Sequence, residues 1–253
     1  MVYEQGLGPI KLSGFNNLTK CLSFNLYDFC ITLNEEQRAQ YIDYIDEVYN
    51  ADKIVAISKK VCDIIHANIL NISKHDYDPV GASSMVLMSD LMKEHAPQVS
   101  IHLDKSHITA HTYPDAGDPN GICSFRVDID IATCGEIIPL KAINHFFEAF
   151  EGDVVHIDYV IRGYTRLEDG KKIYNDHFFN SIQDFIDPKI LADYKFRSDI
   201  NMEYVNTWQT KLLVKEFGPE RYLLNAADVN HSDVPRKMEL LSAEMKEVYH
   251  MIR

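Results

Sequence analysis

The sequence has no apolar run that approaches the roughly 20 residues a membrane-spanning helix needs. Its start, Met-Val-Tyr-Glu-Gln-Gly, also lacks the basic region and apolar run of a signal peptide, so a cytoplasmic location without membrane contact is expected. Basic residues are scarce as well. The 25 Lys and Arg stand against 38 Asp and Glu, which gives a formal net charge of −13. Because such a surface repels phosphate backbones, the composition argues against nucleic-acid binding.

Several sequence patterns of reactive or metal-bound sites are missing too. There is no Gly-x-Ser-x-Gly motif, so the nucleophile turn of an α/β-hydrolase is not indicated. The cysteines are odd in number and none is spaced Cys-x-x-Cys, which argues against a disulfide framework and against a zinc knuckle. Reduced thiols in a cytosolic protein fit this pattern best. The five are Cys21, Cys30, Cys62, Cys123 and Cys134.

What is present is a mixture of strand and helix patterns over 253 residues, enough for one large domain. Apolar and polar residues alternate from 125 to 132, as in a half-buried strand, and Asp169-Gly170 indicates a hairpin. Further strands are expected near residues 18–31, 69–72, 85–88, 99–113, 154–166 and 205–214, and helices near 35–48, 52–66, 139–150 and 234–251. A capping-box pattern at Thr32-x-x-Glu35 is expected to open the first helix. The fold class expected is α+β, with a largely antiparallel sheet and helices packed on one face.

One segment, residues 102–115, concentrates three histidines, a serine and two carboxylic acids. On a strand His107 and His111 share one face and His102 takes the other, so three metal ligands do not converge without a bend. A polar strand with hydrogen-bonded histidines is the favoured alternative to a metal site. Ser106 and His111 are five residues apart, which places them on opposite faces of a straight strand, and a turn, bulge or chain break would be needed to pair them. The residues alone leave the reaction open.

The stretch Asp104-Lys-Ser-His-Ile-Thr-Ala-His-Thr-Tyr-Pro114 closely resembles the processing site of S-adenosylmethionine decarboxylase proenzymes in their longer bacterial form. Seven other stretches resemble the same family and occur in the family's order. They are Gly14–Lys20, Tyr44–Ala51, Ala67–Ile72, Pro79–Ser83, Ala132–Gly135, Ile157–Gly163 and Asn180–Gln183. The resemblance therefore covers nearly the whole chain.

The resemblance implies that a single domain, residues 1–253, cuts its own backbone between Lys105 and Ser106. The Ser106 hydroxyl attacks the Lys105 carbonyl to give an ester, and elimination at Cα then separates residues 1–105 (beta chain) from residues 106–253 (alpha chain). Residue 106 becomes a covalent pyruvoyl group, an electron sink that binds the substrate amine as a Schiff base while carbon dioxide leaves. A strained or bent backbone is expected at Ser106.

Three further residues match positions that have roles in the family. Cys134, in Thr-Cys-Gly, resembles the proton donor of the decarboxylation, and a thiol with an ordinary pKa of about 8.5 is mostly protonated near neutrality. His111 resembles the histidine that handles the Cα proton during processing. Ser83 resembles the serine that hydrogen-bonds the oxyoxazolidine intermediate.

The substrate implied is S-adenosylmethionine, whose decarboxylated form donates aminopropyl groups for spermidine synthesis. Asp115 stands where the family usually has Glu, so the charge remains but its reach is one methylene shorter. Tyr77 and Tyr113 flank the expected site in sequence and are candidates for contact with the sulfonium or the adenine. The family also implies an oligomer of alpha/beta pairs, an αββα sandwich on assembly, and Mg²⁺ as an activator. No loop of clustered acids in the sequence points to a magnesium site.

Two other functions stay open. A pyruvoyl-dependent arginine or ornithine decarboxylase would keep the cofactor and would need acids for a distal cation. A non-catalytic partner subunit would be indicated by the loss of Ser106, His111 or Cys134, and all three are present.

Overall fold

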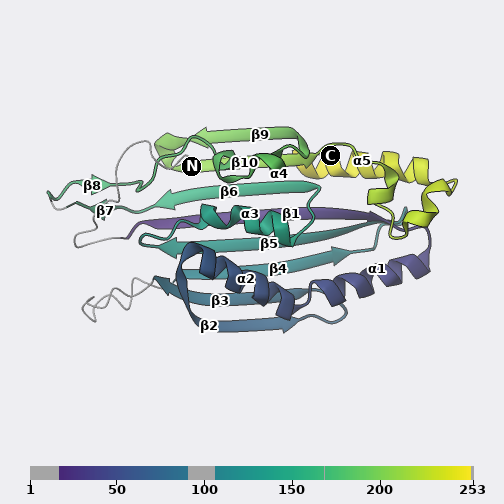
Figure 1. Cartoon of the computed structure of the whole chain (residues 1–253), viewed down its shortest axis with the longest axis horizontal. Helices are drawn as coiled ribbons and strands as arrows, with labels where there is room; N and C mark the ends of the chain where they lie inside the picture. The colour runs from purple at the N-terminus through teal and green to yellow at the C-terminus, as the bar shows by residue number, and fades with distance from the viewer. Residues whose placement is uncertain (1–16, 91–105, 168, 252–253) are drawn as a thin grey trace.

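The computed structural model describes residues 17–90, 106–167 and 169–251, and an eight-stranded antiparallel sheet dominates it (Figure 1). The strand order is β2-β3-β4-β5-β1-β6-β10-β9. The strands are β1 (Thr19–Ile31), β2 (Ala67–Asp76), β3 (Ala82–Asp90), β4 (Ser106–Asp115), β5 (Ile122–Cys134), β6 (Val154–Arg162), β9 (Tyr194–Met202) and β10 (Thr207–Val214). A small ribbon pairs β7 (Thr165–Arg166) with β8 (Lys172–Ile173), which confirms the expected hairpin.

The centre of the sheet follows directly from alternating side chains. β1 and β5 pair along their whole length, from Thr19 with Cys134 to Ile31 with Ile122. On one face of each strand the apolar side chains are almost completely buried, including Phe24 on β1 and Val127 on β5. Since each such side chain contributes about 1.5–3 kcal/mol on burial, these two strands anchor the core.

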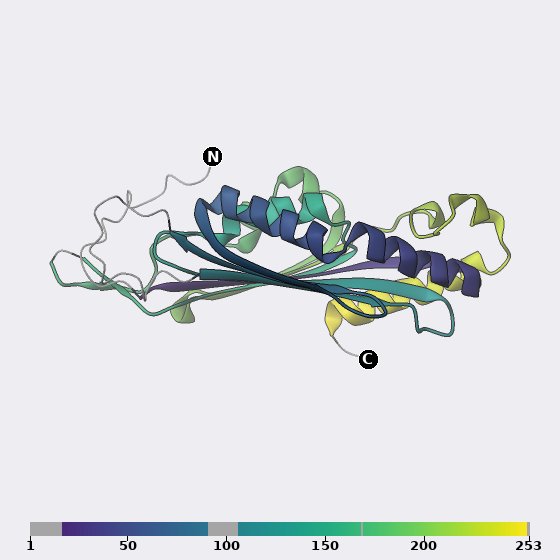
Figure 2. The ribbon, with the colours of Figure 1, turned by 90° about the horizontal axis from the view of Figure 1, so that it is seen from below.

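Three helices cover that face: α1 (Glu35–Val48), α2 (Ala51–Ile65) and α3 (Ile143–Ala149) (Figures 1 and 2). The ring of Phe24 lies 5.0 Å from that of Phe146 and 5.4 Å from that of Phe147, both in α3. The expected class, α+β with a largely antiparallel sheet and helices packed on one face, is therefore confirmed, with the last helix of the chain as an exception.

The last helix, α5 (Val234–His250), lies against the opposite face at one end of the sheet (Figure 2). The alternation of buried residues along β1 shifts by one residue after Tyr27, so that Phe29 and Ile31 are buried and Asp28 is mostly buried beside them. His156, on the α5 side of β6, is hydrogen-bonded to the backbone of Tyr249, and burial lowers its pKa to about 4. No described helix covers the rest of this second face, which we call the open face. Its side chains include Thr19, Cys21, Ser83, Met85, His107, His111, Tyr113, Asp128, Asp130 and Cys134.

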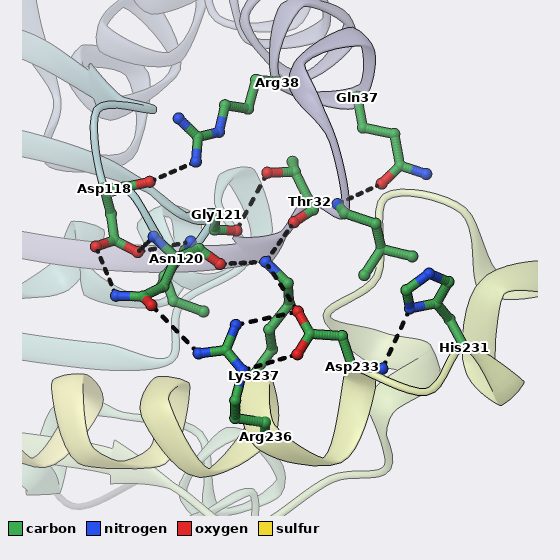
Figure 3. Close-up of polar contacts among 12 residues, drawn as sticks. Thr32, Gln37, Arg38, Asp118, Asn120, Gly121, His231, Asp233, Arg236 and Lys237 are labelled. Carbon is green, nitrogen blue, oxygen red and sulfur yellow. Dashed lines mark hydrogen bonds and ion pairs between the residues drawn. The ribbon is translucent and has the colours of Figure 1, made fainter.

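Figure 3 shows how α5 is held to the end of β1 and to the loop between β4 and β5. The buried Lys237 ammonium donates to the Thr32 carbonyl at 3.0 Å and to the Asn120 carbonyl, with Asp233 at 3.9 Å. Gly121 adopts φ +76°, and a Cβ there would lie 2.4 Å from the Thr32 carbonyl oxygen. Glycine is therefore required where this loop meets β1.

One local expectation differs from the structure, and one strand was not expected. The capping residue of α1 is Asn34 rather than Thr32: its side chain accepts the Gln37 N–H at 2.9 Å, whereas the Thr32 hydroxyl donates to Gly121. The edge strand β9 was not predicted, because it is mostly solvent-exposed and has no apolar alternation. Shorter helical segments complete the described chain: η2 (Pro139–Ala142), η3 (Ile182–Phe185), α4 (Pro188–Leu191), η4 (Glu203–Val205), η5 (Pro219–Arg221) and η6 (Ala226–Asn230). Across the described ranges, every helix is too short or too polar to span a bilayer.

Candidate active site

Ser106 is the first residue of β4 and lies on the helix-covered face. Its side chain is 1% exposed, and Ile108 and Ala110 continue the same buried row. Its hydroxyl oxygen accepts a 3.1 Å hydrogen bond from the backbone N–H of Cys134, the last residue of β5. Two of the residues singled out from the sequence, 28 positions apart, are therefore in direct contact.

The Cys134 thiol faces away from the Ser106 hydroxyl. Cys134 pairs with Thr19 across the β5–β1 ladder, and its Sγ lies 3.8 Å from the Thr19 hydroxyl on the open face. Cys21 is the next open-face residue on β1. Burial is the main cause of the raised pKa of Cys21, and the neighbouring Cys134 thiol adds to it. Gly135 follows with φ +73° and ends the strand. The thiol is half-buried at the edge of a surface that no described helix covers.

Ser83 and His111 form a second pair on the open face. They are direct cross-strand partners between β3 and β4, and Asp128 on β5 flanks His111 on the other side. Burial raises the pKa of Asp128, and Arg126 and His111 oppose that rise. His111 is five residues from Ser106, about 17 Å along the strand, on the other face. The odd-interval argument from the sequence is confirmed, and within one copy the structure does not bring Ser83 or His111 to Ser106.

The expected substrate-contact residues lie beyond His111, toward the far end of β4. The Tyr113 side chain is 48% exposed and its ring stacks at 6.3 Å from that of His111. Asp115 is exposed and accepts the Gly117 N–H at 2.8 Å. Tyr77, 40% exposed, contacts the ring of His75. These three share an end of the sheet with Ser83 and His111, and not with Ser106.

Two expectations concern the cleavage point itself. Lys105 lies outside the described residues. At Ser106 the backbone already belongs to the extended strand β4, and left-handed φ values among described non-glycine residues occur elsewhere, at His66, Asn206 and Met251. The bend expected at Ser106 is thus not present at that residue. Among the same described residues, no group of three or more His, Cys, Asp or Glu side chains is placed to hold a metal ion.

Sequence patterns did not point to Lys20 and Asp176, which lie on the helix-covered side of this site. Lys20 on β1 pairs with Thr133 on β5, and the β4–β5 register, which pairs His107 with Ala132, places Thr133 beside Ser106. The Lys20 side chain is fully buried and its ammonium lies 2.5 Å from Asp176. The available signal was a lysine in a strand position otherwise occupied by Leu22 and other apolar residues.

Comparison with known proteins agrees with these features. A family model described as S-adenosylmethionine decarboxylase matches residues 42–163. Relatives from Stenotrophomonas maltophilia (strain R551-3), Xylella fastidiosa (strain M12) and Xanthomonas campestris pv. campestris (strain B100) are each 47% identical over 255 residues, covering 96% of this chain and 96% of theirs. All three carry the name S-adenosylmethionine decarboxylase proenzyme.

Solved structures that match part of the chain include the adenosylmethionine decarboxylase of Aquifex aeolicus, at 14% identity and a TM-score of 0.36, covering 66% of this chain and 100% of that one. A second is the Trypanosoma brucei AdoMetDC-delta26 monomer, at 11% identity and a TM-score of 0.34, covering 78% and 66% respectively. Membership rests on the sequence relatives. The chain belongs to the S-adenosylmethionine decarboxylase family, as its motifs predicted.

Proposed function

We propose that this protein decarboxylates S-adenosylmethionine after cutting its own chain between Lys105 and Ser106. The observation that carries the proposal is the near-complete match to proenzymes of that name, 47% identical over 96% of the chain. The contact between the Ser106 hydroxyl and the Cys134 N–H supports it, because two residues with matching family motifs meet in space.

In cleavage, the Ser106 oxygen attacks the carbonyl carbon before it and the C–N bond breaks, leaving an ester and a free amine. Removal of the Cα proton then expels the carboxylate of residue 105, and loss of ammonia by hydrolysis leaves a pyruvoyl group at residue 106. The Cys134 N–H, which already donates to the Ser106 oxygen, stabilises negative charge there as the hydroxyl proton departs.

The pyruvoyl group, once formed, supplies an electron sink for decarboxylation. Ser106 fits as its source, because it lies at a strand end, buried, with its oxygen held by a backbone donor. The Cys134 thiol is placed at the same strand end to give a proton to the substrate carbon. The Thr19 hydroxyl at 3.8 Å orients this thiol.

Ser83 and His111 act, in this proposal, on the Ser106 of a second copy. Both lie on the open face, about 17 Å along β4 from Ser106. A twofold axis crossing β4 near Thr109 and stacking two open faces would exchange the two ends of β4, so that each copy's Ser83 and His111 lie over the other's Cys134 thiol and over the strand end that begins with Ser106. Such an interface is self-complementary, as twofold interfaces must be, and produces the αββα arrangement.

The substrate-contact residues fit the same assembly. Because Tyr113 stacks on His111, the same twofold axis would bring it to the end of the other copy's sheet where Ser106 lies. There its exposed ring can contact a sulfonium. Asp115 and Tyr77, at the same end of the sheet, would supply the carboxylate and a second ring. Mg²⁺ as an activator, a cytoplasmic location and a role in spermidine synthesis are part of the proposal that the family membership supports.

Mixed copies test the two-copy site. A Ser106→Ala chain and a His111→Ala chain, each carrying a different tag, are produced together and purified through both tags. We expect the His111→Ala chain alone to be cleaved in the mixture, since its Ser106 receives His111 from the other copy. Mixing Ser83→Ala with His111→Ala is the matched control, because neither composite site is complete. Mixed oligomers that remain uncleaved would contradict the two-copy site.

Carbon dioxide release tests the substrate. The cleaved protein is supplied with carboxyl-labelled S-adenosylmethionine, arginine or ornithine, and uncleaved Ser106→Ala protein serves as the blank. Release from S-adenosylmethionine alone is expected. Release from arginine or ornithine instead would favour a pyruvoyl-dependent arginine or ornithine decarboxylase. Cleavage of the chain without carbon dioxide release from any of the three substrates would contradict the decarboxylase function.

A further inference from the structure

An ion pair between the fully buried Lys20 and the mostly buried Asp176 lies on the helix-covered face, at the same end of the sheet as Ser106. The fully buried Lys20 ammonium is 2.5 Å from one oxygen of Asp176, and the other oxygen lies 2.7 Å from Nδ1 of His177. Nε2 of His177 is 3.3 Å from the hydroxyl of Tyr159, which is also fully buried. Burial alone would raise the pKa of Asp176, but His177 and Lys20 more than offset it and the net direction is downward. The carboxylate, whose side chain is 13% exposed, is therefore held ionised at the boundary of the core.

Stability gives no reason to keep such a pair. Removing two charges from water is costly, and replacing a buried ion pair by well-packed neutral side chains is often neutral or stabilising. The neighbours of Lys20 on the same face of β1 are Leu18 and Leu22, both almost fully buried. An apolar residue would suit position 20 at least as well for packing, so the ion pair calls for a functional explanation.

The contacts around Lys20 lead to Ser106 without a gap. Lys20 is paired with Thr133 in the ladder, and the Thr133 hydroxyl lies 3.4 Å from the Lys20 carbonyl and 3.3 Å from that of Ile137, to which it can donate. The next residue, Cys134, donates its N–H to the Ser106 oxygen. Fixing the Lys20 side chain on Asp176 therefore fixes the strand end that presents this N–H.

We propose that Lys20, anchored by Asp176, is a positioning residue for self-cleavage, which keeps the end of β5 in register so that the Cys134 N–H stays on the Ser106 hydroxyl. The proposal rests on the self-cleavage put forward above. Formation of the Ser106 O–C bond requires near-attack geometry, with the reacting atoms about 3–3.5 Å apart, and a displacement of about 1 Å can cost 10²-fold in rate. A loosened β5 end is enough to slow the reaction without unfolding the sheet.

The test uses a neutral replacement of the pair, Lys20→Met with Asp176→Asn, which keeps the side-chain volumes and an oxygen for His177. Freshly translated full-length chain is followed over time for cleavage, and Tm is measured in a Ser106→Ala background so that all chains stay uncleaved. We expect cleavage at least five-fold slower, with Tm close to that of the parent. Lys20→Arg, which retains the charge, should recover most of the rate. The matched control is the exposed pair Lys215–Asp193, at 2.6 Å, changed in the same way with no effect on cleavage.

Cleavage of the double variant within five-fold of the parent, at similar Tm, would overturn the positioning role and leave the decarboxylase function standing. Failure of the unsubstituted chain to cleave would instead overturn the proposed function. If the double variant does not fold, Asp176→Asn alone decides by the same five-fold limit.

Discussion

The Cys134 main chain and side chain serve opposite faces of the sheet: its N–H donates to the Ser106 hydroxyl at 3.1 Å, while its thiol lies beside Thr19 on the open face. Every substitution of Cys134 other than proline retains the N–H. Self-cleavage and decarboxylation should therefore separate cleanly at this one residue.

Cys134→Ala is the variant that separates them. Cleavage should proceed at close to the parental rate, because the donor to Ser106 is backbone, whereas carbon dioxide release should fall by about 10²–10⁴-fold, the usual contribution of a general acid. Fragment formation on a denaturing gel and labelled carbon dioxide release measure the two steps. An uncleaved Cys134→Ala chain, or one that decarboxylates at the parental rate, would contradict these roles.

Asp115→Asn isolates the charge of the expected substrate contact. The amide oxygen can still accept the Gly117 N–H, so the turn is preserved while the carboxylate charge is lost. Loss of one exposed charge contact of about 1 kcal/mol predicts a KM roughly five-fold higher, with kcat and self-cleavage little changed. Steady-state kinetics at low salt provide the measurement. An unchanged KM would remove Asp115 from the substrate site.

The carboxyl pair Asp28–Asp153 predicts a pH dependence of stability. Burial, followed by the neighbouring Asp153 carboxyl, raises the pKa of Asp28 well above its usual value, and Asp28 donates its proton to Asp153. The folded state thus keeps a proton that the unfolded state releases above about pH 4. Stability present below that pH is lost as pH rises toward the pKa of folded Asp28.

Asp28→Asn keeps a donor toward Asp153 and cannot ionise. Its Tm should therefore fall less than that of the parent between about pH 5 and pH 8, measured in the Ser106→Ala background. Asp46→Asn, an exposed position on α1, is the control and should leave the parental dependence unchanged. An Asp28→Asn profile parallel to the parent's would show that Asp28 is not the titrating group.

The hydrogen bonds of Lys237 to two main-chain carbonyls are expected to contribute to the free energy of unfolding. Lys237→Met removes the donor to the Thr32 and Asn120 carbonyls. The expected loss is about 1–3 kcal/mol, or about 2–4 °C in Tm for each 1 kcal/mol, measured by thermal denaturation. Arg236→Met, on the exposed side of α5, serves as the control with little change in Tm. Equal Tm values for the two variants would argue against the carbonyl contacts as a source of stability.

The sequence predicted most of the fold because most elements are half-buried. The alternation around Val127 and the helical spacing of Ile54 and Val61 each mark an element with one buried and one solvent-facing side. These patterns predicted β5 and α2. The edge strand β9 is mostly exposed on both faces, so no alternation of apolar residues predicted it. The position of α5 on the opposite face is a matter of tertiary packing, which periodicity alone cannot specify.

The candidate residues of the site could be named from the sequence, but their arrangement could not. Motifs singled out Ser106, Cys134, His111 and Ser83 as candidates. The odd interval between Ser106 and His111 predicted that these two residues lie on opposite faces of the strand, as the structure has them. That Cys134 serves Ser106 through its N–H depends on the β4–β5 register, which no local pattern encodes. Lys20 was not predicted for the same reason. Its contacts with Thr133 and Asp176 are distant in sequence and depend on the tertiary fold.

The most direct test of self-cleavage is the intact mass of the denatured protein. We expect two fragments that meet at Lys105–Ser106, the larger being lighter by one ammonia than a chain beginning with serine, as a pyruvoyl terminus requires. A single uncleaved chain of 29.1 kDa after long incubation would contradict self-cleavage and favour the non-catalytic partner subunit.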